Sequence, residues 1–206
     1  ISYFNFDYTF VLCVSKHNDQ FSFKNKYYLM NIKKFKYKRV KSTNDIAINI
    51  IRKKNIKSGI VIAENQKKGR GQMGKKWISY KGNLFVTIFY SLDKIDLTLR
   101  ELTKANVNLV IKLISYYYKK NIKLKLPNDI LINKSKICGI LQEKVQKNGI
   151  NYLIVGIGLN LVKSPNIKEY PTTNLYELTK KKLNTEKVSK QLMLIYANFF
   201  KSKGFF

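Results

Sequence analysis

The sequence predicts an α+β fold in which helices pack on a mixed, largely antiparallel sheet. Strand-like and helix-like segments alternate through the first half of the chain. Asn148-Gly149 then joins two long apolar runs, which is the signature of a two-residue hairpin turn between antiparallel strands. The chain finishes in two helical patterns. This order favours one sheet with helices covering one of its faces.

The first elements are a strand and a capped helix. Residues 35–40 alternate in polarity, as a strand does. They lead into a helix that Ser42 or Thr43 can cap at its N-terminus. Three isoleucines are expected to face inward from it: Ile46, Ile50 and Ile51.

Two strands and the clearest helix follow. Residues 58–65 read as a buried strand, and residues 83–92 as a strand rich in β-branched and aromatic residues. Residues 97–121 repeat apolar side chains at helical spacing. The side chains expected on its apolar face are Leu99, Leu102, Leu109, Leu113 and Tyr117.

The second half contains the hairpin and the closing helices. Pro127 interrupts the strand pattern of residues 122–133, so we expect an edge strand or a bend there. The hairpin covers residues 135–161, and a polar loop covers residues 162–173. A short helix over 174–180 and an amphipathic helix over 185–203 complete the pattern.

Composition points to one folded domain. The 206 residues are 45% hydrophobic and 13% aromatic, which argues against general disorder. No apolar run reaches the ~20 residues of a membrane-spanning helix. We expect residues 1–34 to form an N-terminal extension ahead of a domain over residues 35–206. The chain begins with Ile1, so a targeting segment ahead of it stays open.

The net charge of +28 is extreme. It is typical either of a polyanion-binding protein or of a chain with a biased composition. The lysines are spread along the chain and form no single block, which favours the second interpretation. A partner with an acidic surface suits both.

The cysteines and the histidine exclude several site classes. Cys13 and Cys138 have no zinc-site spacing and predict no disulfide framework, so a reducing intracellular compartment, cytoplasm or organelle, is expected. Cys138 lies in an apolar run and is expected to be a buried free thiol. His17 is the only histidine, so a Ser-His or Cys-His catalytic pair is not favoured.

The stretch ENQKKGRGQMGKKW, residues 64–77, predicts an anion-binding loop. Gly69, Gly71 and Gly74 allow backbone N–H groups to converge on an anion. Arg70 lies between two of these glycines, where a guanidinium can bind a carboxylate or phosphate through two hydrogen bonds. The spacing matches neither a Walker loop nor a dinucleotide fingerprint. A flexible basic surface loop is the alternative.

Four segments together resemble the biotin–protein ligases, also called holocarboxylase synthetases. They are STN at 42–44, the glycine-rich loop at 64–77, KLPNDILINKSKICGIL at 125–141 and VGIGLNL at 155–161. Their order and spacing agree with the family over about residues 38–180. The resemblance implies an α+β domain related to class II aminoacyl-tRNA synthetases. It also implies a ligase that forms biotinyl-5′-AMP from biotin and MgATP, then transfers biotin to a lysine of the biotin carrier domain of a carboxylase.

The resemblance also implies roles for individual residues. Arg70 and Lys136 would act on the biotin carboxylate and the phosphate, as catalytic and binding residues for both substrates. Gly71 would offer its N–H to the acyl phosphate, and Asn160 would lie near the nucleotide with the closing segment 166–175. Asn128 or Asp129 would help to place Mg²⁺. Biotin contacts would come from Ser42, Thr43, Asn44, Gln66, Gln72 and Gly139.

The isolated motifs also have structural interpretations. Ser42 can serve as a helix cap as well as a ligand. Trp77 is expected to anchor the loop by packing. Gly156 and Gly158 are expected to permit close packing in a strand.

The sequence departs from the family at three places. Gln72 and Met73 follow Gly71 where a second arginine is usual, so the adenylate intermediate is expected to be held differently. Leu126 replaces the tryptophan of the KWPND motif. The small C-terminal β-barrel domain of the family is expected to be absent, since the sequence stops at Phe206.

Two alternatives remain at this stage. A lipoate–protein ligase shares the fold and the adenylation chemistry, but its run of three glycines after paired arginines is not matched by GRGQMG. A basic nucleic-acid-binding module would need aromatic side chains facing outward beside the lysines, and residues 83–92 are the candidate strand. A nucleic-acid partner and a membrane partner are both disfavoured.

Overall fold

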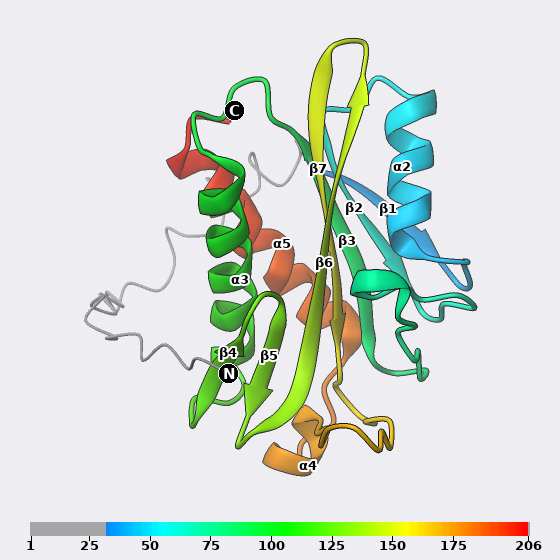
Figure 1. Ribbon diagram of the computed structural model, residues 1–206, viewed down its shortest axis with the longest axis vertical. Coiled ribbons are helices and arrows are strands. Elements are labelled where there is room, and N and C mark those ends of the chain that lie inside the picture. The colour runs from blue at the N-terminus through cyan, green and yellow to red at the C-terminus, as the bar shows by residue number, and fades with distance from the viewer. Residues whose placement is uncertain (1–31, 206) are drawn as a thin grey trace.

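A seven-stranded sheet forms the centre of the computed structural model, which describes residues 32–205 (Figure 1). The strand order is β1-β2-β3-β7-β6-β5-β4. Their bounds are β1 Lys33–Tyr37, β2 Ser58–Ala63, β3 Leu84–Ser91, β4 Ile122–Lys125, β5 Asp129–Ile132, β6 Ser135–Lys147 and β7 Ile150–Leu159. Within this sheet β1 and β2 are parallel and every other neighbouring pair is antiparallel. The predicted largely antiparallel sheet is confirmed.

The predicted hairpin turn is present between β6 and β7. Asn148 and Gly149 both have positive φ, at 50° and 78°. Two successive residues in this region define the tight turn whose twist suits antiparallel strands, and glycine adopts it without a steric penalty. The turn fixes the register of the two longest strands, from Lys147–Ile150 to Cys138–Leu159.

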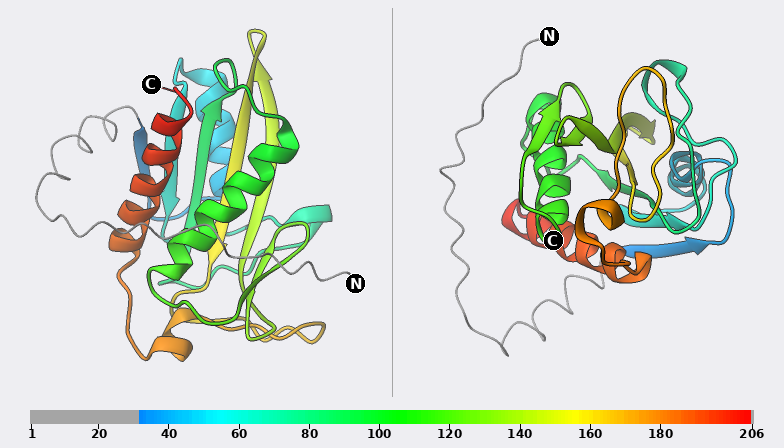
Figure 2. Two further views of the ribbon diagram at one scale, coloured as in Figure 1. Left: turned by 90° about the vertical axis from the view of Figure 1, so that its left-hand side faces the viewer. Right: turned by 90° about the horizontal axis from the view of Figure 1, so that it is seen from below.

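Helices cover both faces of the sheet, which corrects the expectation that they cover one. Their bounds are α2 Thr43–Lys53, α3 Leu99–Ser115, α4 Leu175–Thr179 and α5 Thr185–Ser202, with a short 3-10 turn, η1, at Gln72–Gly74. Figure 1 shows α3 and α5 on one side of the strands and α2 on the other. The view from below in Figure 2 separates them in the same way.

Alternate residues of β3 explain the two covered faces. Ile88 and Tyr90 belong to the larger core, which α3 and α5 close. Phe89 points the other way and packs in a smaller core with Ala47 and Ile51 of α2. A strand buried on both faces has a continuous apolar sequence, so the pattern of β3 does not reveal on which side each helix lies.

Three details of the helices differ from expectation. Leu99 is 53% exposed because α3 begins at this residue, directly after a capping box between Thr98 and Glu101. Helix α3 ends at Ser115, so Tyr117 lies beyond it and packs against the larger core from outside the helix. Ile46 is only partly buried on α2.

The N-terminal extension lies outside the described residues, apart from Ile32 and the first two residues of β1. Its boundary at residue 34 therefore stays a prediction. Among residues 32–205, no helix combines the length and apolar character that a bilayer crossing requires.

Candidate active site

A pair of glycines on β6 and β7 forms the floor of the site, on the α2 face of the sheet. Gly139 and Gly158 lie opposite each other in the two strands. A Cβ at Gly158 would lie 2.3 Å from the Trp77 ring, and a Cβ at Gly139 would lie 2.7 Å from it. The indole therefore packs directly on glycine backbone. The predicted packing roles of Trp77 and Gly158 are confirmed, whereas the biotin contact assigned to Gly139 stays a prediction.

An irregularity between β5 and β6 turns Lys136 toward this floor. Ile130 pairs with Cys138 while the next residue, Leu131, pairs with Lys136, so Ile137 is an extra residue in β6. Side chains alternate across a strand, and an extra residue changes which side chain shares a face with Gly139. Ile137 accordingly joins the larger core and is fully buried.

Lys136 is enclosed by one carboxylate and two aromatic rings. Its Nζ lies 2.8 Å from Asp129 Oδ1, and its side chain is 15% exposed. The ring centroids of Trp77 and Tyr170 lie 5.6 Å and 5.2 Å from the same nitrogen. Cations are attracted to the faces of aromatic rings at these distances, and low exposure strengthens the attraction. The ammonium is thus held in place from several directions.

Lys136 also lines a narrow pocket between two loops. The glycine-rich loop forms one wall and the loop after β7 forms the other. The lining residues are Lys76, Trp77, Ile78, Lys136, Asn160, Pro165, Ile167, Tyr170 and Thr172. The indole Nε1 of Trp77 is buried and donates to no acceptor within residues 32–205.

The second loop is fastened by two buried asparagines at the end of β7. Asn160 donates from Nδ2 to Thr173 O at 3.1 Å. Asn83 Oδ1 accepts from the backbone N–H groups of residues 161–163 at 3.0, 3.0 and 3.2 Å. Sequence reasoning found Asn160 but missed Asn83, whose only signal is a polar residue at the start of an apolar strand.

Arg70 lies outside this pocket, between two carboxylates. Its two Nη atoms lie 2.9 and 2.8 Å from the oxygens of Glu143, and Nη2 lies 2.9 Å from Asp45 Oδ1. The guanidinium is 38% exposed. Within the loop, Gly71 N–H donates to Lys75 O at 2.7 Å. The N–H assigned to the acyl phosphate is therefore engaged inside the loop.

The structure does not bring Arg70 and Lys136 together around one anion. They belong to the same face of the sheet, because the extra residue Ile137 places Lys136 on the face of β6 that also carries Glu143. Seven residues separate Glu143 from Lys136, which at about 3.3 Å per residue is roughly 20 Å of strand. Arg70 must leave Glu143 to reach the pocket that Lys136 lines. Gln72, in the half-exposed η1 turn, would travel with it.

Four of the five polar residues assigned to biotin converge at the N-terminus of α2, and Gln72 is the exception. Gln66 Oε1 accepts from Thr43 N and Oγ1 at 2.8 and 3.1 Å. Asn44, which is 2% exposed, lies against Gly156 and donates to Glu143 Oε2 at 2.6 Å. Ser42 occupies the N-cap position, is buried, and makes no side-chain capping bond.

Thr87 completes this network and was missed by sequence reasoning. Its Oγ1 lies 2.6 Å from Asn44 Oδ1 and 2.8 Å from Thr43 Oγ1. It is the polar residue within the apolar run of β3, which is a usable signal. Glu143 and Asp45 were missed as well, because a single acid in a polar strand or helix turn has no distinctive pattern.

The residues assigned to Mg²⁺ do not form a metal site by themselves. Asn128 donates from Nδ2 to Ile140 O at 2.9 Å, which holds the β4–β5 turn to β6. Asp129 Oδ1 lies against the Lys136 ammonium. Residues 32–205 contain no cluster of three or more histidine, cysteine, aspartate or glutamate side chains suited to a metal. The Mg²⁺ assignment stays a prediction.

Most residues of the site fall within one known sequence pattern. The pattern that defines the Biotin/lipoate A/B protein ligase family matches residues 37–160, from the strand before Ser42 to Asn160. This chain belongs to that family. Its similarity within the family is to biotin–protein ligases.

Three relatives of the ligase family illustrate the similarity. The bifunctional ligase/repressor BirA of Bacillus subtilis is 29% identical over 145 residues, covering 66% of this chain and 44% of BirA. The biotin–[acetyl-CoA-carboxylase] ligase of Paracoccus denitrificans is 31% identical over 116 residues, covering 52% of this chain and 46% of that ligase. The Aquifex aeolicus biotin protein ligase, solved in complex with biotin and ATP, has a TM-score of 0.69 at 27% identity, covering 83% of this chain and 72% of that one.

The chain spans less than half the length of these two curated relatives. The similarity therefore concerns the region that carries the sheet and the pocket. The activity of the whole protein, its substrates and its partners are matters of proposal.

Proposed function

We propose that this chain is an ATP-dependent biotin–protein ligase. In the first step a biotin carboxylate oxygen attacks the α-phosphorus of ATP, and pyrophosphate leaves with the electrons of the broken P–O bond. In the second step the ε-amine of an acceptor lysine attacks the acyl carbon, loses a proton and releases AMP. The acceptor is the biotin carrier domain of a biotin-dependent carboxylase.

The observation that carries the proposal is the position of Lys136. The first step brings two anions together, and their repulsion must be offset where charge develops. Lys136 is a fixed positive charge of low exposure at one end of the pocket. A cation in such a dry site acts more strongly than one in water and needs no reorganisation during the reaction. Removing one such donor typically costs roughly 3–4 kcal/mol of barrier.

The network at the N-terminus of α2 suits the neutral ureido ring of biotin. That ring presents N–H donors and a carbonyl acceptor, so it needs hydroxyl and amide partners. Ser42 supplies a buried hydroxyl that is not used for capping, and Gln66 and Asn44 supply amides. The pocket with Trp77 and Asn160 is then left for the nucleotide.

Magnesium would enter bound to the phosphates of ATP. Mg²⁺ in nucleotide sites is usually held by one or two carboxylates together with phosphate oxygens. Here the nearest carboxylate, Asp129, faces the Lys136 ammonium. We therefore assign no step to a protein-held metal.

Biotin-dependent exchange of pyrophosphate into ATP tests the first step, and transfer of labelled biotin to a carrier domain tests the second. Lipoate in place of biotin, and salt-dependent binding to nucleic acid, are the comparison arms. We expect exchange and transfer with biotin alone. Exchange with lipoate but not biotin would overturn the proposal in favour of a lipoate ligase. A nucleic-acid module is disfavoured because Phe85, Phe89 and Tyr90 of β3 are buried and offer no outward stacking surface.

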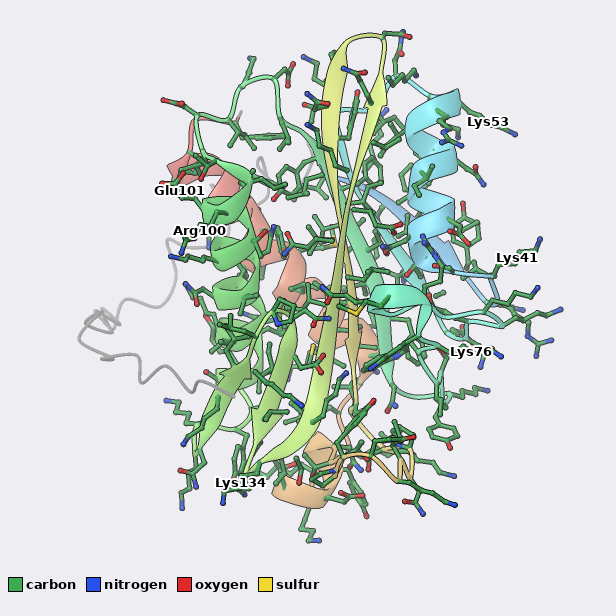
Figure 3. The ribbon with its side chains drawn as sticks, in the orientation of Figure 1. Lys41, Lys53, Lys76, Arg100, Glu101 and Lys134 are labelled. Atoms are coloured by element: carbon green, nitrogen blue, oxygen red, sulfur yellow. The ribbon has the colours of Figure 1, made fainter. Side chains whose placement is uncertain are left out.

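An exposed row of cations beside the site suits an acidic acceptor. The segments before α2 and after β2 run side by side, with Lys67 N–H donating to Val40 O and Lys68 N–H to Lys41 O, both at 2.9 Å. Figure 3 shows Lys41 and Lys76 projecting from the same side of the molecule, opposite Arg100 of α3. We call this surface the basic rim; its members are Lys38, Arg39, Lys41, Lys67, Lys68, Lys75 and Lys76.

None of the rim side chains forms an ion pair within residues 32–205, so all seven charges are available to a partner. Complementary charge mainly accelerates encounter, and salt screens it. Lys67→Glu with Lys68→Glu should raise KM for the carrier domain and leave biotin binding unchanged. Lys181→Glu with Lys182→Glu, at an exposed distant site, is the matched control. Equal effects of the two pairs would refute a docking role for the rim.

A further inference from the structure

Two carboxylates hold Arg70 away from the pocket in which it is expected to act. The chain has 12 acidic residues against 40 basic ones, yet two acids converge on this one arginine. Glu143 binds it through both carboxylate oxygens, and Asp45 adds a third contact from the first turn of α2. We call Asp45 and Glu143 the carboxylate pair.

The carboxylate pair presents acceptor oxygens to Arg70 in the same way as a phosphate does. A guanidinium binds carboxylate and phosphate oxygens in the same two-pronged geometry. All three side chains are partly exposed, at 38% for Arg70, 42% for Asp45 and 26% for Glu143. Ion pairs with such exposure are weak, so an anion in a less hydrated pocket can replace them.

Glu143 also touches the polar network assigned to biotin. Its Oε2 accepts from Asn44 Nδ2 at 2.6 Å while it binds Arg70. Asn44 in turn contacts Thr87 and lies over Gly156. Glu143 therefore joins Arg70 of the glycine-rich loop to the polar network at the biotin side of the site. A change in the contacts of Arg70 alters what Glu143 can offer Asn44, and a change at Asn44 alters what Glu143 can offer Arg70. Such coupling is reciprocal.

We propose that the carboxylate pair is a resting position for Arg70, from which the phosphates of ATP withdraw it during loop closure. Glu143 is a positioning residue for Arg70. Because it also contacts Asn44, it links the release of Arg70 to the binding of biotin beside Asn44. This inference rests on the proposed function, since the competing anion is the nucleotide. It accounts for the separate carboxylate partners of Arg70 and Lys136.

The test is the double variant Asp45→Asn, Glu143→Gln. Both changes remove charge and keep size, and the amide oxygen introduced at position 143 can still accept from Asn44. The rate of trypsin cleavage measures how accessible the loop is. The potential cleavage sites in it are Lys67, Lys68, Arg70, Lys75 and Lys76. We expect faster loop cleavage in the ligand-free variant, equal protection by ATP, and a KM for ATP about three- to tenfold lower than in the wild type.

Glu186→Gln is the matched control, because it removes an exposed carboxylate from the Lys36–Glu186 ion pair, outside the loop and its partners. It should change neither readout. Asp45→Asn alone guards against misfolding, and it should give a smaller shift in the same direction. Unchanged cleavage and KM, or a raised KM, in the double variant would overturn the inference. If the wild type lacks biotin-dependent exchange, the proposed function fails and with it the withdrawal of Arg70 by ATP, whereas the cleavage rates of the ligand-free proteins still decide whether the carboxylate pair holds the loop.

Discussion

Lys136 lies in a strand beneath two aromatic rings, whereas Arg70 lies in a glycine-rich loop between two partly exposed carboxylates. The strand cation has a backbone held by β5 on one side and by Pro171 and Thr173 on the other. Arg70 follows Gly69 and precedes Gly71. Its side chain contacts residues outside the loop, whereas the backbone on either side of it is held by hydrogen bonds within the loop. Under the proposed function, the Lys136 charge is preorganised and the Arg70 charge is recruited, so the first would lower the barrier and the second would respond to nucleotide binding.

The largest effect is expected from Lys136→Met, which removes the fixed charge and keeps the chain length. Pyrophosphate exchange should fall by roughly 10²–10³. The melting temperature should fall too, because Asp129 loses its counter-ion in a largely buried position.

The double variant Asp129→Asn, Lys136→Met separates these two effects. It should recover the melting temperature and not the activity. Exchange at the wild-type rate in Lys136→Met would remove this residue from the mechanism.

Gly158→Ala should disturb the preorganised side of the site through Trp77. Its Cβ would lie 2.3 Å from the indole, so the ring must move off the sheet. We expect a stability loss of about 1–3 kcal/mol, measured by denaturant unfolding, and a decrease in exchange of about tenfold. Adding Trp77→Phe, a smaller ring, should recover part of the stability. No recovery in the double variant would show that the clash is not with the indole.

Arg70→Ala should affect nucleotide binding more than stability. The arginine is partly exposed and its ion pairs are weak, so the unfolding free energy should change by less than about 1 kcal/mol. Exchange should fall about tenfold or more, with a raised KM for ATP. A stability loss equal to that of Lys136→Met would contradict the contrast drawn between the two cations.

Gln72→Arg should sharpen the same contrast by adding a second recruited cation to the loop. Gln72 lies half-exposed in η1, where a longer side chain has room. We expect released biotinyl-AMP to decrease several-fold when the intermediate is trapped in the absence of acceptor, because a charged donor binds the phosphate more strongly than an amide. Equal release from both proteins would show that the second arginine of the family has no counterpart role here.

The smallest effect is expected at Cys138. Burial raises the pKa of its thiol far above the usual range, so the reactive thiolate is not formed at neutral or mildly alkaline pH. Alkylation at pH 8 should leave Cys138 unmodified in the folded protein and modify it after denaturation, as read by peptide mass spectrometry. Labelling of the folded protein at Cys138 would place the thiol nearer to solvent than the structure has it.

Local sequence patterns predicted the strands and most of the helices because their signals lie within a few residues. Asn148-Gly149 specifies its hairpin by backbone preference alone. The side of the sheet on which α2 packs depends on contacts with Phe89 and Ile154, which are distant in sequence. An apolar stripe shows that one face of a helix must pack against other residues. It does not show which face of the sheet the helix packs on.

The site could be predicted where residues belong to a recognisable motif. Arg70, Lys136 and the group around Asn44 were found in this way. Glu143 and Asp45 were not, because their importance comes from meeting Arg70 across the fold. The separation of the two cations was also missed, since the motifs describe which residues act and leave their resting partners open.

The extra residue in β6 also limits which insertions and deletions the chain can accept between Asp129 and Gly139. Between Asp129 and Gly139 the backbone makes one turn and one departure from regular pairing. Deleting Ile137 itself would leave Lys136 on its present face, whereas deleting a residue of the turn before Ser135 and pairing the strands regularly would exchange the faces of Lys136 and Ile137. The Lys136 ammonium would then face the larger apolar core and Ile137 would face the indole of Trp77. Homologues should therefore tolerate substitutions in this stretch far more readily than insertions or deletions.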